Sequence, residues 1–353
     1  MMEFYKNKRI MVTGHTGFKG SWLAIWLNRL GAEVIGFSKN PYTEKDNFVL
    51  SGIGRKIKDL RGDIRDSYQL KKIFAKYQPE IVFHLAAQSL VRQSYKYAVE
   101  TYETNVMGSI NLMEAFRNSR SAKVAIMVTS DKCYENKERQ TPYSEEDAMG
   151  GYDPYSSSKG AAEIAISSWR RSFMNPKYYA THNKSIASVR AGNVIGGGDW
   201  TKDRIIPDCI RAIEAHKPID IRNPKAIRPW QHVLEPLSGY LLLAKKMWEN
   251  PVDFCEGWNF GPLQNSNVNV FEIASMIIDY YGDGRLNKTI SNDNLHEAQL
   301  LTLDIKKAQS RLGWNPRLSI DETIRFTVDW YKNYKTSSVY DLCVNQILKY
   351  IEK

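Results

Sequence analysis

The segment "RIMVTGHTGFKGSWLAIWLNRLGAEVIGFS" constrains the fold more than any other stretch, because a glycine-rich turn joins an apolar strand to a helix and a second strand. Gly14, Gly17 and Gly20 stand three residues apart in this turn. Glycine allows a tight turn and close approach to a ligand, and the following helix amino terminus attracts a pyrophosphate. The spacing differs by one position from the G-x-G-x-x-G dinucleotide fingerprint, but its strand-turn-helix context is the required one. The segment therefore predicts a nucleotide-binding βαβ unit.

Further strands alternate with helical segments along the chain. The apolar runs "EIVFHLAAQ" and "KVAIMVTS" are typical of buried parallel strands. This alternation predicts a Rossmann-type, doubly wound parallel α/β sheet, and 353 residues leave room for a smaller mixed α/β substrate-binding domain. We expect the dinucleotide-binding domain to span residues 1–192, with a segment near 230–250 returning to it. Residues 193–353 should form mainly the substrate domain.

The composition is that of an ordinary globular protein, with 42% hydrophobic and 25% charged residues. A secretion signal and a long apolar span are both absent from the sequence, so we expect a cytoplasmic protein. The 4 cysteines are scattered, which predicts reduced thiols and no metal site. The 49 Lys+Arg residues outnumber 39 Asp+Glu but are dispersed, so a small-molecule substrate is favoured over nucleic acid or membrane.

A second motif begins at "DPYSSSKGAAEIAISSW", where Asp153 and Pro154 form a helix start. Tyr155 and Lys159 stand four residues apart and share one face of that helix. An ammonium close to a phenol favours the phenolate, which would lower the tyrosine pKa from about 10 and make it a base near neutrality. The spacing by itself is common, so it gains weight only beside other motifs.

A polar triplet, Ser130, Asp131 and Lys132, closes the strand "KVAIMVTS". In open α/β sheets the carboxyl end of a strand is where ligands bind. The triplet is therefore expected to face the tyrosine and lysine of the second motif.

Taken together, the glycine turn, the Ser130 strand end and the Y-x-x-x-K helix resemble the extended short-chain dehydrogenase/reductase family over almost the whole chain. The resemblance implies that Tyr155 is the proton-transfer base, that Lys159 binds the nicotinamide ribose and that Ser130 assists. It also implies contacts with a nicotinamide dinucleotide, and the cofactor-binding residues expected besides Tyr155 and Lys159 are Gly14, Thr16, Gly17, Phe18, Lys19, Gly20, Asp63, Ile64, Leu85, Ala86, Ala87 and Asn105.

The choice between NAD and NADP stays open at this stage. A site for NAD usually has an acidic residue at the end of the second strand, where it bonds the ribose 2′-hydroxyl. Here "VIGFSKNP" offers Ser38 and Lys39, and a lysine could instead meet a 2′-phosphate. NAD is the expected cofactor, with NADP as the alternative.

Within the family, "TSDKCY" resembles the nucleotide-sugar 4,6-dehydratases. In their dTDP-glucose branch an Asp protonates the departing 6-hydroxyl and the following Glu removes the C5 proton. Asp131 keeps the first place, but Lys132 takes the second. The triplet and the segments "VRAGNVIGGGDWTKDRIIPDCIRA", "IRNPKAIRPWQHVLEPLSGYLLLA" and "HEAQLLTLDIKKAQSRLGWNP" are similar to the branch that acts on CDP-glucose.

The resemblance implies a lyase that converts CDP-D-glucose to CDP-4-keto-6-deoxy-D-glucose and water by transient hydride transfer, for dideoxy-sugar and lipopolysaccharide biosynthesis. Asn193, Arg204 and Arg228 are the expected substrate-binding residues. Asn193 follows a strand and could reach a phosphate or the nicotinamide side, and the guanidinium groups of Arg204 and Arg228 can clamp a pyrophosphate bidentately. A homodimer or homotetramer is expected. The alternatives are another dehydratase or a 4-epimerase of the family, or a non-catalytic NAD(P)-binding sensor.

The sequence leaves the charge of Lys132 open. As the C5 base it must be neutral, which requires desolvation. As a stabiliser of the enolate it stays charged. Asp131 as the acid must have a pKa raised by burial.

Overall fold

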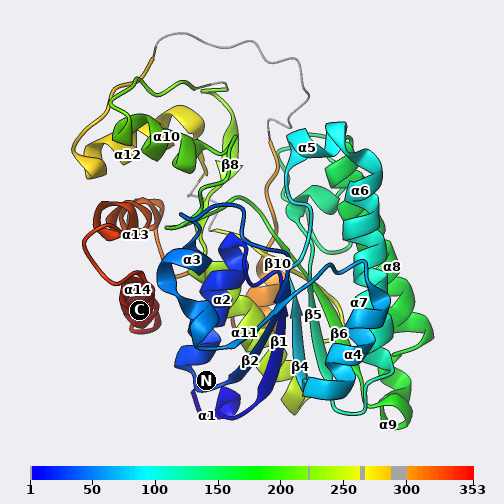
Figure 1. Cartoon of the computed structure of the whole chain (residues 1–353). Helices are drawn as coiled ribbons and strands as arrows, with labels where there is room; N and C mark the ends of the chain where they lie inside the picture. The colour runs from blue at the N-terminus through cyan, green and yellow to red at the C-terminus, as the bar shows by residue number, and fades with distance from the viewer. Residues whose placement is uncertain (1, 222, 263–266, 288–299) are drawn as a thin grey trace.

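The computed structural model describes residues 2–221, 223–262, 267–287 and 300–353 (Figure 1). Its centre is a 7-stranded sheet in the order β10-β6-β5-β4-β1-β2-β3, in which every pairing is parallel. The strands are β1 (Arg9–Thr13), β2 (Glu33–Ser38), β3 (Lys58–Arg61), β4 (Ile81–His84), β5 (Val124–Val128), β6 (Ser185–Ala191) and β10 (Gly257–Phe260). The predicted doubly wound parallel sheet is confirmed. The strand order reverses between β1 and β4, which is where such sheets bind ligands.

One face of the sheet is covered by α2 (Phe18–Arg29) and α11 (Leu234–Glu249). The short α3 (Asn47–Ser51) and the C-terminal α14 (Val339–Ile351) pack outside α2 (Figure 1). Trp22 and Trp26 of α2 are fully buried, as the apolar face of this segment requires for packing on a sheet.

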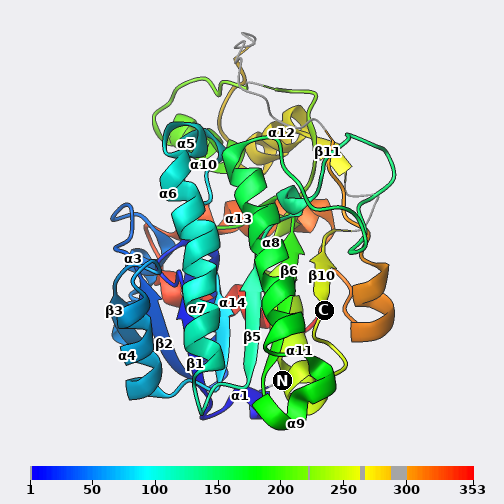
Figure 2. The ribbon, with the colours of Figure 1, turned by 90° about the vertical axis from the view of Figure 1, so that its right-hand side faces the viewer.

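The other face carries α4 (Ser67–Tyr77), α7 (Gly108–Arg117) and α8 (Pro154–Ser172) (Figure 2). A bent helical run leads into α7, through α5 (Val91–Lys96), α6 (Ala98–Tyr102) and the π-helical η2 (Glu103–Met107). The helix α8 begins where the sequence predicts, because the Asp153 carboxylate accepts a hydrogen bond from the Ser156 amide at 3.0 Å and Pro154 takes the first position.

A smaller mixed lobe lies beyond the carboxyl ends of the strands (Figure 1). It contains the helices α10 (Ile205–Glu214), α12 (Val270–Tyr281) and α13 (Ile320–Asn333). Two small sheets accompany them, antiparallel β8 (Ile227–Pro229) with β11 (Asn267–Asn269) and parallel β7 (Val194–Ile195) with β9 (Gln231–His232). The remaining short elements are α1 (Met2–Tyr5), η1 (Ile53–Arg55), η3 (Asp131–Cys133), η4 (Pro176–Tyr178), α9 (Tyr179–His182) and η6 (Ala308–Leu312).

The C-terminal helix packs against α2 and α11, a position that the sequence did not indicate. The Tyr350 hydroxyl donates to Glu235 of α11 at 2.7 Å, and the Tyr340 hydroxyl donates to Asn28 of α2 at 2.8 Å. The strand β10 likewise joins the sheet beside β6. Since late segments pack on the sheet, a domain boundary at residue 192 stays a prediction. Across the described ranges, the helices are all too short or too polar to cross a bilayer.

Candidate active site

The glycine turn after β1 contains two kinds of glycine: those that chain packing requires and one that it does not. Gly14 has φ +75°, and a Cβ on it would lie 2.7 Å from the Ala86 amide nitrogen. A Cβ on Gly20 would lie 2.0 Å from the Gly14 carbonyl oxygen. Gly17, at the N-cap of α2, has an ordinary φ of −75°, and its nearest neighbour would be the same oxygen at 3.4 Å. Chain packing therefore requires glycine at 14 and 20, whereas the smallness of Gly17 fits a phosphate lying on the helix amino terminus.

The turn is held at the edge of the sheet by its neighbours. The Thr16 hydroxyl lies 2.8 Å from the Ser38 hydroxyl and donates to the Lys39 carbonyl at 3.1 Å, which ties the turn to the end of β2. The segment Leu85–Ala87 follows β4 and its backbone meets Gly14. Phe18 reaches the later Gly196, where a Cβ would lie 3.1 Å from its ring. These predicted cofactor-binding residues are thus brought together around one loop.

Asp63 follows β3 and is engaged by two cations. Its carboxylate accepts from Arg65 Nε at 3.0 Å and Nη2 at 2.7 Å, and Lys39 Nζ lies 3.1 Å away. Burial would raise the pKa of Asp63, but these partners outweigh it and hold the pKa well below its usual range. Lys39 Nζ also lies 3.6 Å from a Glu100 carboxylate oxygen. Lys39 is therefore paired with carboxylates, while Ile64 beside Asp63 is buried in the core.

Asn105 lies in η2 and is 1% exposed. Its Oδ1 accepts from the Gln88 amide at 2.8 Å, and its Nδ2 donates to the Gln88 carbonyl at 3.0 Å and to Ser158 Oγ at 2.9 Å. The side chain joins the loop after β4 to α8. In this geometry Asn105 shapes the loop, and its predicted direct contact with a cofactor stays a prediction.

The polar triplet and the second motif meet at the end of β5. Asp131 and Lys132 lie in η3, which packs on α8. Gly160, next to Lys159, makes this contact possible, because a Cβ on it would lie 2.4 Å from the Gly150 carbonyl oxygen and 3.2 Å from the Cys133 carbonyl oxygen. The helix and the triplet therefore come together through backbone contact.

Asp131 is 3% exposed, and its Oδ1 accepts from the Ser130 hydroxyl at 3.0 Å. Burial raises the pKa of Asp131, while the charges of Lys132 and Arg228 and the Ser130 hydrogen bond oppose the rise. A carboxyl group with a raised pKa can hold a proton nearer neutrality. A pKa raised by burial is what Asp131 requires if it is to act as the acid, as expected from the sequence.

The electrostatics of α8 differ from the expectation. Burial raises the pKa of Tyr155 to about 12, and a side-chain hydrogen bond with Ser130 opposes the rise. Burial lowers the pKa of Lys159 to about 8, and the nearby charge of Glu163 opposes this fall. The predicted lowering of the tyrosine pKa is wrong for the protein alone, because loss of hydration at the phenol outweighs its favourable neighbours.

Lys19 comes from the glycine turn but shares the electrostatic surroundings of the triplet. Burial lowers the pKa of Lys19 to about 8, the charges of Lys159 and Arg204 lower it further, and Asp131 raises it. Lys19 therefore lies among the reactive side chains as well as at the helix amino terminus.

The predicted substrate-binding residues gather near the same edge. Arg204 is the N-cap of α10, donates to Asp199 Oδ2 at 2.8 Å, and its charge lowers the pKa of Tyr155. Arg228 in β8 is 7% exposed, and its charge acts on Asp131. Asn193 follows β6, and its carbonyl accepts from the Gln231 amide at 3.1 Å. The two arginines thus approach Tyr155 and Asp131, and Asn193 lies at the end of the adjoining strand.

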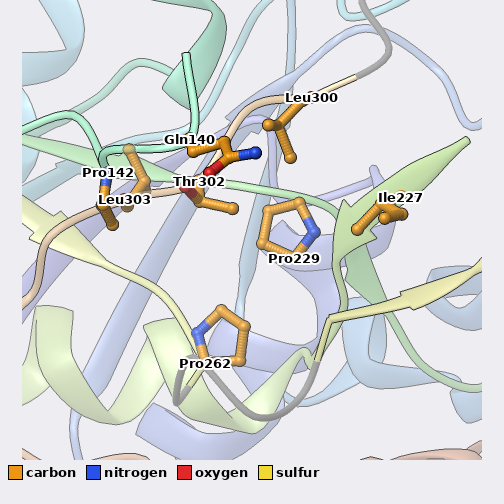
Figure 3. A pocket seen from close by; sticks show the side chains of 8 residues that line it. All are labelled: Gln140, Pro142, Ile227, Pro229, Pro262, Leu300, Thr302 and Leu303. Carbon is orange, nitrogen blue, oxygen red and sulfur yellow. The ribbon is translucent and has the colours of Figure 1, made fainter. Parts of the chain in front are cut away.

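A cavity of ≈ 430 Å³ opens between β8, the loop after η3 and the segment that leads to η6 (Figure 3). Figure 3 shows the side chain of Thr302 turned toward Pro229. The same proline borders the triplet, because a Cβ on Gly192 would lie 2.7 Å from Pro229 Cγ and 3.2 Å from Asp131 Oδ2. The remaining lining residues are Pro142, Ile227, Pro262, Leu300 and Leu303. The start of the "HEAQLL" motif, residues 296–299, lies outside the described residues.

Sequence reasoning missed one charged pair of this region. Glu163 and Arg190 form a buried ion pair, with Arg190 Nε 2.9 Å from Glu163 Oε1. The available signal was a carboxylate four residues after Lys159 in the otherwise small and apolar run "GAAEIAI".

Comparisons with known proteins find relatives of this chain. A family model described as GDP-mannose 4,6 dehydratase matches residues 11–327. A CDP-glucose 4,6-dehydratase of Salmonella typhimurium is 48% identical over 330 residues, which cover 94% of this chain and 92% of that protein.

Two solved structures are similar in fold. A dTDP-glucose 4,6-dehydratase from Streptomyces venezuelae, crystallised with NAD bound, is 21% identical with a TM-score of 0.78, covering 92% of this chain and 97% of the other. A UDP-glucose 4-epimerase from Thermotoga maritima is 22% identical with a TM-score of 0.75, covering 92% of this chain and 99% of the other.

Substitution by alanine should have different effects at Gly17 and at Gly20. We expect Gly17→Ala to destabilise the protein by less than about 1 kcal/mol, because alanine is a poorer N-cap than glycine but its Cβ makes no close contact with the chain. The same substitution should weaken NAD binding about tenfold by intruding on the phosphate. Gly20→Ala should destabilise the protein by about 1–3 kcal/mol, because its Cβ overpacks the turn. Thermal unfolding and isothermal titration calorimetry measure both. Equal loss of stability in the two variants would contradict the assignment of Gly17.

Proposed function

Because the chain belongs to the GDP-mannose 4,6-dehydratase family of extended short-chain dehydrogenases/reductases, we propose that it is a CDP-glucose 4,6-dehydratase. The reaction converts CDP-D-glucose to CDP-4-keto-6-deoxy-D-glucose and water. One observation carries the proposal: the triplet Ser130, Asp131 and Lys132 packs against the helix of Tyr155 and Lys159 in a chain 48% identical to a protein of that name.

NAD is the cofactor that the residues fit. Gly17 leaves room for a phosphate at the amino terminus of α2. Lys39 is paired with Asp63 and Glu100, so a 2′-phosphate would have to compete with two carboxylates for it. When bound, NAD supplies an acceptor for the C4 hydride and returns that hydride to C6. Tyr155, Lys159 and the residues of the glycine turn would hold it.

Oxidation at C4 requires removal of the 4-hydroxyl proton, and Tyr155 is positioned for that step. Its pKa of about 12 in the protein alone means that the phenolate needs positive neighbours. Arg204 already lowers the pKa of Tyr155, and Lys159, one helical turn away, carries a proton on most molecules below its pKa of about 8. Tyr155 therefore acts as base with the help of nearby cations.

Elimination of water follows, because the new 4-keto group acidifies the C5 proton. Asp131 gives its proton to the departing 6-hydroxyl, a role supported by its burial and raised pKa. Lys132 stands next to it with two roles open, neutral base at C5 or charged stabiliser of the enolate. A 4-epimerase needs Tyr155 and Lys159 but has no step for a buried acid, so Asp131 favours the dehydratase.

Substrate binding is assigned to the smaller lobe and its border. Arg228 and Arg204 approach the reacting side chains, and we assign them to the pyrophosphate, which a guanidinium binds well. The cavity of Figure 3 adjoins Asp131 through Pro229, and its ≈ 430 Å³ lies in the range of small-molecule sites. It is assigned to part of the nucleotide sugar.

The outer face of α6, η2 and α8 is assigned to a second copy of the chain (Figure 2). Val99 is 73% exposed, Met107 50% and Ile164 62%, so apolar side chains gather on neighbouring helices. A single exposed apolar residue is normal, but a group of them on one face indicates an interface. A homodimer through this face accounts for the exposure.

The reaction can be tested with CDP-glucose deuterated at C4. We expect one water lost per turnover and deuterium recovered at C6 of the product, because the hydride taken from C4 is the one returned to C6. Mass spectrometry and nuclear magnetic resonance of the product measure both. Net release of reduced cofactor without dehydration would refute the proposed function, and substrate inverted at C4 would identify an epimerase.

Asp131→Asn should separate oxidation from elimination. The amide cannot protonate the 6-hydroxyl, so we expect dehydration to fall about 100-fold or more while the absorbance of reduced nicotinamide builds up during turnover. Lys132→Arg and Lys132→Gln extend the test, because arginine keeps the charge but cannot act as a base. If Lys132→Arg stays active and Lys132→Gln does not, Lys132 is the charged stabiliser of the enolate. If both variants lose activity, Lys132 is the base at C5. Normal dehydration by Asp131→Asn would exclude Asp131 as the acid.

The interface can be tested by introducing charge. We expect Val99→Glu together with Ile164→Glu to yield monomers, because two buried carboxylates per subunit oppose association. Light scattering after size-exclusion chromatography gives the mass. Phe271→Glu, at a position 50% exposed on α12, is the matched control and should remain dimeric. A dimer that survives the double substitution lies on another face.

A further inference from the structure

The carboxylate of Glu163 is buried close to the reacting groups, yet the reaction scheme assigns it no step. Its Oε1 accepts from Thr129 Oγ1 at 2.5 Å and Arg190 Nε at 2.9 Å. Its Oε2 accepts from Ser188 Oγ at 2.7 Å and Arg190 Nη2 at 2.9 Å. Glu163 is 3% exposed and Arg190 is 5% exposed. A buried ion pair of this kind is tolerated because the charges are matched and the lone pairs are filled.

Glu163 connects the two parts of the site. It stands four residues after Lys159 on α8, so the two side chains share one face of the helix. Thr129, which donates to it, immediately precedes Ser130. A single carboxylate thus belongs to the helix of Tyr155 and Lys159 and is bonded to the strand that ends in the triplet.

Arg190 extends the connection to the other end of the triplet. Its Nη1 donates to the Tyr134 hydroxyl at 2.6 Å, and that hydroxyl donates to Asn259 Oδ1 at 2.7 Å. Asn259 Nδ2 donates to the Tyr143 carbonyl at 2.9 Å. Tyr134 directly follows η3. The pair Glu163–Arg190 therefore fixes the chain just before Ser130 and just after Cys133.

We propose that Glu163 is a positioning residue, which holds the Ser130–Lys132 triplet against α8 and whose negative charge keeps Lys159 protonated during turnover. The proposal deepens the proposed function and rests on it, since it concerns the same reaction. It adds a residue that touches neither substrate nor cofactor.

The groups around Lys159 explain why the charge of Glu163 matters. Burial disfavours the Lys159 ammonium, and the charge of Glu163 favours it. Lys19 of the glycine turn and His84 of β4 also face Lys159. Burial lowers the pKa of both groups, and the charge of Lys159 lowers it further. The Cys133 thiol has a pKa raised well above its usual value by burial, so it carries no charge near neutrality. Among these groups Glu163 is the one that supplies a negative charge.

The test compares Glu163→Gln with Arg190→Gln through the pH dependence of kcat/KM for CDP-glucose. Both variants break the ion pair, so both should melt at lower temperature. Only Glu163→Gln removes the negative charge, which lets the pKa of Lys159 fall further below about 8. We expect the alkaline limb of the kcat/KM profile of Glu163→Gln to move about one pH unit toward acid. The alkaline limb of Arg190→Gln should not move in that direction.

Two further variants keep the test decisive. Glu163→Asp retains the charge but shortens the side chain, so kcat should fall while the alkaline limb stays in place. Glu163→Gln combined with Arg190→Gln leaves no unpaired buried charge, which protects folding, and should still show the displaced limb. The affinity for NAD, measured by calorimetric titration at several pH values, gives a readout independent of turnover. In Glu163→Gln the loss of NAD affinity at alkaline pH should move toward acid together with the alkaline limb of kcat/KM.

A uniform loss of activity in Glu163→Gln at all pH values, with the limb and the NAD titration unmoved, would reduce Glu163 to a structural role and overturn the proposal. This outcome differs from failure of the proposed function, in which the unmodified protein does not dehydrate CDP-glucose at all. In that case the NAD titration still decides whether Glu163 sustains the charge of Lys159.

Discussion

Close contact of backbone with backbone at the carboxyl edge of the sheet is the constraint on which the rest of the site depends. Glycines permit it at each point: Gly14 lies against the Ala86 amide, Gly20 against Gly14, and Gly160 of α8 against Gly150. A side chain at any of these positions would separate loops that must touch. Because the loops after β1, β4 and β5 are drawn together in this way, residues far apart in the sequence share one small volume.

The same closeness excludes water, and burial is the largest influence on the pKa values of Asp131, Tyr155, Lys159 and Lys19. It raises the pKa of Asp131 and of Tyr155 and lowers that of Lys159 and of Lys19, so each shift disfavours the charged form. For Asp131 this suits an acid. For Tyr155 and Lys159 it opposes the chemistry, and charged neighbours must compensate. Glu163 is such a neighbour, and its own charge is stabilised by Arg190.

Much of this arrangement could be predicted from local sequence. The glycine turn, the apolar strands and the helix start at Asp153 each depend on neighbouring residues, and the sheet and α8 lie where those signals indicated. The direction of the Tyr155 pKa could not be predicted, because it depends on how much water the fold excludes. Nor could the return of α14 to α2 and α11, since an amphipathic helix does not specify the surface that it covers.

By itself the sequence determined the βαβ pattern, the turn that fits a dinucleotide and the chemical types at the strand end, because period, spacing and residue type are local properties. Only the tertiary structure decided that Lys19 shares its surroundings with Asp131, that Lys39 is already paired with carboxylates and that Glu163 binds the strand before Ser130. Those facts depend on distances between segments widely separated in the chain. Such distances are set by packing and burial of the whole fold, which no short stretch of sequence contains.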